Sequence, residues 1–119
     1  MRVFLDDWRN PIDCVGYMHS RIGSDNKLYL DEWFVVRSMT ELTHVLNGFD
    51  DKITHISFDY DLYEYKDYDD NNGADCLMVT IKHFAFKELE LPKIYIHSQN
   101  MNGQVLLDLI LKNKETFQN

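Results

Sequence analysis

Three short apolar runs in this sequence stop abruptly at polar side chains, and this pattern restricts the fold more than any other feature. The runs are VFLDD at 3–7, ISFDYDL at 56–62 and IYIHSQN at 94–100. The first two end in aspartates, and the third ends in histidine, serine and asparagine. Apolar runs of this length with β-branched and aromatic residues are typical of buried strands. We therefore predict a strand in each run, with its polar end at the boundary of the core.

Patterns with helical period separate the strands. Ser38 and Glu41 have the S-M-T-E spacing of a capping box, in which Glu41 reaches back to a free backbone amide. Gly48 is expected to end that helix, Gly73 to precede the next one, and 102–113 to form the last. The apolar faces expected to be buried are Leu42, Val45, Leu46 and Phe49; Leu77, Met78, Ile81, Phe84 and Ala85; and Val105, Leu106, Leu109 and Ile110.

Strands and helices alternate along most of the chain. The strands are predicted at 2–5, 33–37, 53–58 and 93–97. This alternation implies parallel strands with helices on both faces, and the near-continuous apolar character of the strands agrees with it. The predicted fold class is α/β: one three-layer α/β/α domain over residues 1–119, with a mostly parallel central sheet of four to five strands.

Two segments do not follow the alternation. In 12–32, SDN at 24–26 is a turn signal, and the stretches CVGYMHSR and KLYL on either side of it are compatible with a small hairpin. The segment 63–72 combines acidic residues with Tyr63, Tyr65 and Tyr68. Long loops in compact domains are usually functional. We predict that 63–72 overhangs the strand ends as a lid.

The polar strand ends are expected to converge. Parallel strands share one edge at their carboxyl ends, and ligands of open α/β sheets bind there. The side chains predicted to meet are Asp6, Asp7, Asp59, Asp61, His97, Ser98 and Asn100. Crowded carboxylates repel each other and acquire raised pKa values unless a cation neutralises them. The alternative reading is that these acids only cap helices and close turns.

A divalent cation is the expected partner of the acids. Hard oxygen ligands suit Mg²⁺ or Mn²⁺, and Mg²⁺ leaves coordination positions for phosphate oxygens. We predict that Asp6, Asp7 and Asp59 hold this ion. Asp59 and Asp61 alternate around Tyr60, so they point to opposite sides if the strand geometry persists, and only one of them faces the ion.

Composition restricts the partners. The 119 residues carry a formal net charge of −8, which disfavours duplex DNA but permits a small phosphorylated ligand beside a bound cation. No stretch is long and apolar enough to span a membrane. The two cysteines, Cys14 and Cys76, have no metal-ligand spacing and are interpreted as reduced thiols. A cytoplasmic location is expected.

The polar clusters also carry a family resemblance. FLDDWRNP at 4–11, VVRS at 35–38, ISFDYDL at 56–62 and HSQNMNG at 97–103 resemble successive motifs of the cyclic-phosphate-processing receiver-like domains. The resemblance implies a receiver, or flavodoxin-like, fold and action on cyclic nucleotides or cyclic phosphate ends of RNA, in RNA repair or in conflicts between prokaryotes and phages. The acidic pocket that it implies consists of Asp6, Asp7, Asp59 and Asp61, surrounded by Arg9, His97, Ser98 and Asn100.

The chain departs from the family pattern at two positions. Tyr60 stands where the family usually has a histidine, which removes one candidate proton-transfer group, and Met101 stands where it usually has a proline. Receivers suggest a third possibility, phosphorylation of Asp59, but the lysine that holds the phosphoryl group is replaced by His97 and Ser98. The phosphorylation switch therefore ranks low.

The functional hypothesis is a metal-dependent phosphoesterase that acts on cyclic phosphates. His97 and Asp59 are the expected catalytic residues, with His97 as general acid or base. The expected substrate-binding residues are Arg9, Arg37, Ser98, Asn100 and Asp61. The alternative is a non-catalytic module that sequesters a nucleotide signal or docks to a protein, with tyrosines of 63–72 stacking on a base.

Overall fold

Four parallel strands form the central sheet in the described part of the protein. The computed structural model describes residues 1–62 and 71–118. Its strands are β1 (Arg2–Leu5), β2 (Phe34–Val36), β3 (His55–Phe58) and β4 (Lys93–Ile96), in the spatial order β2-β1-β3-β4. This is the order of the first four strands in a flavodoxin-like 2-1-3-4-5 sheet. The predicted α/β class and parallel sheet are confirmed, with four strands.

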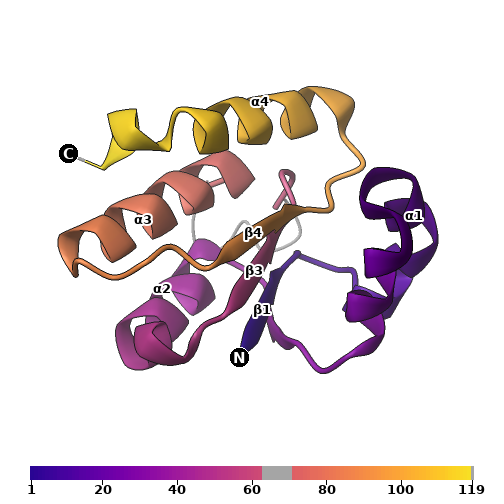
Figure 1. The fold of residues 1–119 in the computed structure, drawn as a ribbon, viewed down its shortest axis with the longest axis horizontal. Helices are drawn as coiled ribbons and strands as arrows, with labels where there is room; N and C mark the ends of the chain where they lie inside the picture. Colours follow the sequence, from indigo (N-terminus) through magenta and orange to yellow (C-terminus); the bar gives the residue numbers. More distant parts are fainter. Residues whose placement is uncertain (63–70, 119) are drawn as a thin grey trace.

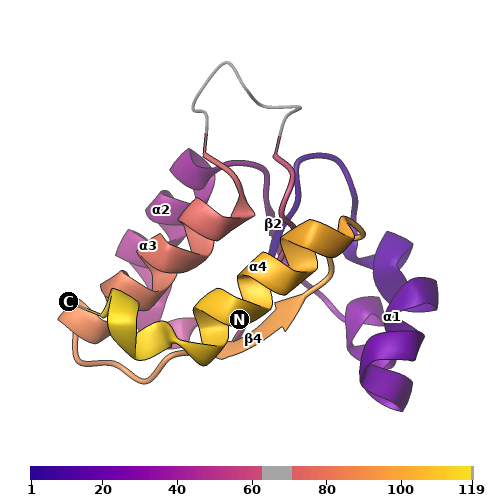
Figure 2. The same cartoon turned by 90° about the horizontal axis from the view of Figure 1, so that it is seen from above.

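The helices cover both faces of the sheet (Figures 1 and 2). Helix α1 (Val15–Ile22) lies on one face, and α2 (Met39–Phe49), α3 (Gly73–Phe86) and α4 (Met101–Lys112) lie on the other. Both faces need cover because successive side chains of a strand point to opposite faces of the sheet, and those of β1 are apolar on both. Val3 and Leu5 join the larger core under α2, α3 and α4, whereas Phe4 packs in the smaller core beside α1. No described helix is both long and apolar enough to cross a bilayer.

The segment 12–32 is helical, so the hairpin expected there is wrong. A 3-10 turn (Pro11–Cys14) leads into α1, and a second 3-10 segment (Gly23–Leu30) follows. The turn signal marks the end of α1, where Gly23 has a φ of 62°. Met18 and Tyr29 are buried against the Phe4 face of the sheet. Packing on that face, which local signals do not reveal, decided the conformation.

Helix α2 is capped much as predicted but extends past its expected end. The Ser38 hydroxyl accepts a bond from the Glu41 amide at 3.2 Å. The Glu41 carboxylate accepts a bond from the amide of Arg37, one residue before the expected position. Gly48 lies inside the helix, and Phe49 is 45% exposed rather than buried.

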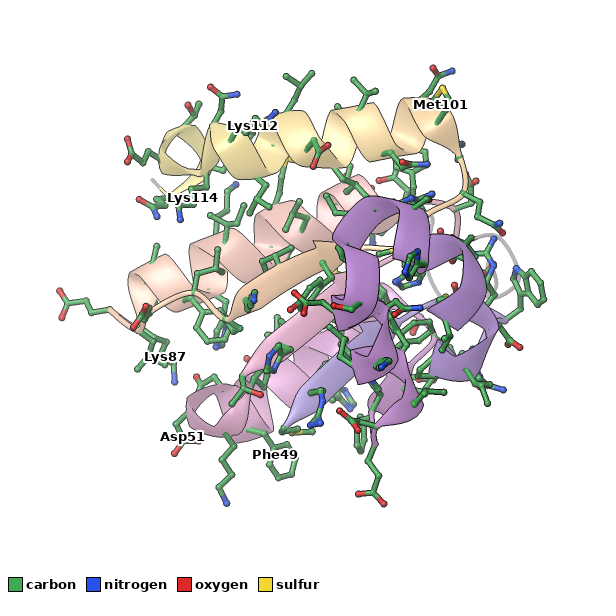
Figure 3. The ribbon with its side chains drawn as sticks, turned by 45° about the vertical axis from the view of Figure 1, so that its right-hand side comes forward. Phe49, Asp51, Lys87, Met101, Lys112 and Lys114 are labelled. Carbon is green, nitrogen blue, oxygen red and sulfur yellow. The ribbon has the colours of Figure 1, made fainter. Side chains whose placement is uncertain are left out.

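Helix α4 buries Ile110 as predicted, but the rest of its buried face differs from the predicted one. Its buried residues are Gly103, Leu107 and Ile110, whereas the predicted core residues Val105, Leu106 and Leu109 are 55%, 39% and 52% exposed. Gly103 faces the ring of Tyr60 so closely that a Cβ atom there would lie 2.5 Å from Tyr60 Cγ. With Gly103 against Tyr60, the exposed apolar residues lie on the side of α4 away from the core. Figure 3 shows Met101 projecting from the start of the same helix.

Candidate functional site

The carboxyl ends of β1, β3 and β4 bring three of the predicted residues into one cluster. Leu5 pairs with Phe58 and Phe58 pairs with Ile96, so the residues that follow are neighbours across the sheet. One potential ligand atom from each of Asp6, Asp59 and His97 lies within 4.8 Å of the others. The predicted convergence at this edge is therefore found for these three side chains.

Asp6 is the most completely bonded member of the cluster. Its carboxylate accepts hydrogen bonds from the Trp8 amide at 3.0 Å, the Arg9 amide at 2.9 Å, Arg9 Nη1 at 3.1 Å and His97 Nε2 at 3.1 Å. Burial opposes ionisation, but the bonds from His97 and from the Trp8 and Arg9 amides outweigh it and lower the pKa of Asp6 to about 2. Asp6 is therefore a buried anion whose position is fixed.

Asp59 has the opposite electrostatic surroundings. Burial and then the negative charge of Asp6 raise the pKa of Asp59 to about 7, against the lowering effects of the Tyr60 amide, Arg9 and the Ser98 hydroxyl. Arg9 Nη1 lies 3.6 Å from Asp59 Oδ1, farther than from Asp6. A carboxyl group that titrates near neutrality can both accept and donate a proton at physiological pH.

His97 is the third member of the cluster, next to Asp6 and Asp59. Its side chain is fully buried, Nδ1 bonds Ser57 Oγ at 2.6 Å, and that hydroxyl bonds the Tyr29 hydroxyl at 2.7 Å. The imidazole stacks on the Phe4 ring at a centroid distance of 4.2 Å. Burial, above all, lowers its pKa. Both ring nitrogens are hydrogen-bonded and Nε2 contacts Asp6, so this geometry leaves the general acid–base role of His97 a prediction.

Ser57 and Tyr29 are site residues that sequence reasoning missed. Ser57 interrupts the apolar run of β3 and is fully buried, which was the one available signal. Tyr29 belongs to the segment 12–32, for which the sequence suggested a hairpin instead of the observed helical turns. Together with His97 they form a buried chain of hydrogen bonds that ends on the Asp6 carboxylate.

Arg37 follows β2 and contacts the loop after β1. Arg37 Nη1 donates to the backbone oxygens of Asp6 and Arg9, and Nη2 donates to Asn10 Oδ1 at 2.8 Å. The guanidinium therefore holds the loop that follows β1. Asp7 is buried beside Asp6 at the same strand end.

The predicted residues near α4 form a second, smaller group. Asn100 caps α4 by accepting a bond from the Gly103 amide at 3.0 Å, and its Nδ2 donates to Asp61 Oδ2 at 3.2 Å. The buried Ser98 hydroxyl accepts a bond from the Asn100 amide at 3.2 Å. Ser98 connects this group to the cluster, because its hydroxyl also bonds Asp59.

Two glycines let helices start against the site. A Cβ atom on Gly73 would lie 1.8 Å from the backbone oxygen of Asp59, and the Gly73 amide donates to the Tyr60 oxygen at 2.7 Å. Gly103 likewise accommodates the Tyr60 ring. Tyr60 thus packs between the starts of α3 and α4. Asn72, at the end of the predicted lid, caps α3; residues 63–70, with Tyr63, Tyr65 and Tyr68, lie outside the described residues.

Trp8 is an exposed aromatic side chain beside the cluster that sequence reasoning did not single out. It is 61% exposed, and the guanidinium of Arg9 lies over its ring at 5.0 Å from the centroid. A flat ring next to a cation is a surface on which a base can stack while the cation meets a phosphate.

The donor chemistry of the cluster suits a divalent cation. Carboxylate oxygens are preferred ligands of Mg²⁺ and Mn²⁺. The raised pKa of Asp59 indicates that Arg9 does not fully compensate the two acids. The hydrogen bonds of Asp6, however, already use both of its oxygens, so a cation held there competes with the Arg9 side chain.

Comparison with known proteins identifies the family of the chain. No curated protein and no solved structure matches the chain. Residues 1–113 match the family described as Cyclic-phosphate processing Receiver domain. The match covers all four strands, the four α-helices up to Lys112 and every residue of the cluster. The chain belongs to the Cyclic-phosphate processing Receiver domain family.

Proposed function

We propose that this protein is a phosphoesterase that hydrolyses a cyclic phosphate in a small cyclic nucleotide or at an RNA end. The observation that carries the proposal is Asp59, a buried carboxyl group with a pKa raised to about 7, beside the Arg9 guanidinium. Family membership supplies the substrate class, and the site supplies groups suited to it.

The proposed reaction uses Asp59 for proton transfer. The Asp59 carboxylate takes a proton from the attacking water as the new oxygen–phosphorus bond forms. One ester bond of the ring then breaks, and the proton passes from Asp59 to the leaving sugar oxygen. Arg9 binds non-bridging oxygens and stabilises their developing charge, with Ser98 and Asn100 beside it. Arg37 supports this arrangement by holding the loop that carries Arg9.

The proposal includes a divalent cation, Mg²⁺ or Mn²⁺. Asp59 and Asp6 provide the carboxylates that would hold it; Asp7, the third predicted ligand, lies outside the group of converging ligand atoms. When bound, such an ion polarises the phosphoryl group and lowers the pKa of coordinated water. The ion and the proton then compete for Asp59, so metal dependence and pH dependence are coupled.

Turnover assays test the proposal. 2′,3′-cyclic nucleotides, 3′,5′-cyclic nucleotides and cyclic dinucleotides are incubated with the protein in Mg²⁺, Mn²⁺ or a chelator, and products are followed by phosphorus NMR. Asp59→Asn is expected to lose about 10²–10⁴-fold in rate. The matched control is Asp25→Asn, which changes an exposed aspartate outside the cluster. Absence of turnover with every substrate and metal contradicts the enzyme.

A second candidate is a module that sequesters a nucleotide without chemistry. The exposed Trp8 ring with Arg9 above it, and a histidine that does not reach solvent, favour this candidate. Calorimetry with the same ligands separates the two, because a sequestering module binds tightly and returns the ligand intact. A cytoplasmic location also remains a proposal; its support is that Cys14 and Cys76 are buried thiols.

A further inference from the structure

The outer edge of β4 carries backbone groups that β3 does not use. The amides of Lys93 and His97 donate to Thr54 and Phe58, so the alternate residues Ile94 and Ile96 direct their N–H and C=O groups away from β3. Arg21 Nη1 lies 3.3 Å from the Ile96 oxygen, which confirms this direction. In the described part of the chain, the Ile94 N–H, the Ile94 oxygen and the Ile96 N–H have no hydrogen-bonding partner.

This edge lies at the bottom of a groove of about 310 Å³ between α1 and α4. Met18, Arg21 and Ile22 form the α1 wall, and Asp108 and Leu111 belong to the α4 wall. Figures 1 and 2 show the two helices on opposite faces of the sheet beside β4. The groove therefore follows the line along which another strand would extend the sheet.

Of the devices that keep sheet edges unpaired, β4 has a short length of four residues, Lys93 at its start and Arg21 on the Ile96 oxygen, but it has none at Ile94. The strand KIYI contains no proline and no charge after Lys93, and the Lys93 ammonium lies over the Tyr95 ring at 5.5 Å. Parallel sheets are normally covered on their faces, and exposed β-branched edges are templates for a further strand. In the flavodoxin-like order, the position beside the fourth strand belongs to a fifth.

We propose that the β4 edge binds an extended segment of a partner protein as a fifth strand. Successive side chains of that segment would point alternately to the α1 and α4 walls. One wall carries the cation Arg21 and the other carries the anion Asp108. The segment that fits is apolar, with an acidic residue facing α1 and a basic residue facing α4.

The charges favour this partner over a second copy of the chain. Two copies would join β4 to β4 in antiparallel fashion about a twofold axis, with equivalent faces on the same side. Arg21 would then approach the Arg21 side of the other copy, and Asp108 the Asp108 side, so like charges would meet. A partner strand with alternating charges avoids both repulsions.

A synthetic peptide tests the proposal on the whole protein. The probe is a nine-residue peptide of valine and isoleucine with glutamate on one face and lysine on the other. Amide hydrogen exchange is measured by NMR with the peptide at millimolar concentration. We expect exchange at Ile94 and Ile96 to slow by at least about tenfold, while the already bonded Lys93 and His97 amides change less. Because backbone pairing tolerates many sequences, unchanged exchange at Ile94 and Ile96 overturns the proposal.

Two protein variants sharpen the test. Ile94→Pro removes an outward N–H without removing a bond to β3 and is expected to abolish peptide binding, whereas Ile94→Val retains it. Arg21→Glu is expected to weaken binding several-fold, up to about tenfold, and Lys82→Glu on α3 is the control with the same change in charge. A folded Ile94→Pro that binds equally well contradicts the proposal. So does protection of Ile94 that grows with protein concentration alone, because it identifies a second copy as the occupant.

Discussion

Asp6 and Asp59 are neighbouring acids that the fold places in different electrostatic states. Four hydrogen-bond donors hold Asp6 as an anion, with a pKa of about 2. Asp59 is buried beside that anion and has a pKa of about 7. Pairs of carboxyl groups whose pKa values are driven apart are typical of acid–base chemistry. The fixed charge of Asp6 thus adjusts the titration of Asp59.

Removing the charge of Asp6 is therefore expected to lower the pKa of Asp59. In Asp6→Asn the burial of Asp59 persists, so its pKa falls below 7 but stays above the ordinary value of 3.8. Carbon NMR titration of the Asp59 carboxyl group measures the change. Asp25→Asn, at an exposed position, leaves the titration as it is in the wild type. An unaltered value in Asp6→Asn would mean that burial alone sets the pKa.

Asp59 also makes stability depend on pH. Its folded-state pKa is raised, so the folded protein binds the proton more tightly than the unfolded chain. The free energy of unfolding is therefore expected to fall as pH rises from about 4 to about 7. Asp6 acts in the opposite direction, and its contribution is lost as pH falls from about 4 towards 2. Urea unfolding of wild type and Asp59→Asn across this range checks the first effect, because the variant lacks the decrease between pH 4 and 7.

At the scale of single elements, glycines control how α3 and α4 approach the site. Gly73→Ala places a methyl group against the Asp59 backbone oxygen and is expected to destabilise the protein by about 1–3 kcal/mol or more. Gly48→Ala, inside α2 with nothing within 4 Å of the added carbon, is expected to stabilise by about 0.5–1 kcal/mol. Denaturant unfolding compares the two. Equal effects would refute the close approach at Gly73.

The orientation of α4 gives a second test at this scale. Leu107 is fully buried, so Leu107→Ala is expected to cost about 2–5 kcal/mol. Leu109 is 52% exposed on the opposite side, and Leu109→Ala is expected to cost less than about 1 kcal/mol. Thermal or urea unfolding of both variants decides which face meets the core. A larger loss of unfolding free energy in Leu109→Ala than in Leu107→Ala would support the buried face expected from the sequence.

At the scale of the whole molecule, a cation bound to the acids stabilises the folded state by mass action. The proposed ion binds only when the strand ends are assembled, so the melting temperature is expected to rise with Mg²⁺ or Mn²⁺ concentration. Asp59→Asn is expected to melt higher than the wild type without metal at pH 7 and to lose the metal response. Asp25→Asn retains it. A wild-type melting temperature that is indifferent to both ions contradicts the metal site.

The sequence alone determined the strands and the parallel sheet, because apolar runs and their alternation with helices are local patterns. It also determined that Asp6, Asp59 and His97 meet, because the carboxyl ends of parallel strands share one edge. Tertiary structure decided the surroundings of each residue in that cluster. His97 lies under Phe4 and beside Ser57, which removes it from solvent, while burial next to Asp6 makes Asp59 the group that titrates. Burial depends on what packs against a residue, and the turn signal in the segment that contributes Tyr29 did not reveal its packing on Phe4. For the same reason, only the folded chain revealed which face of α4 is apolar and exposed.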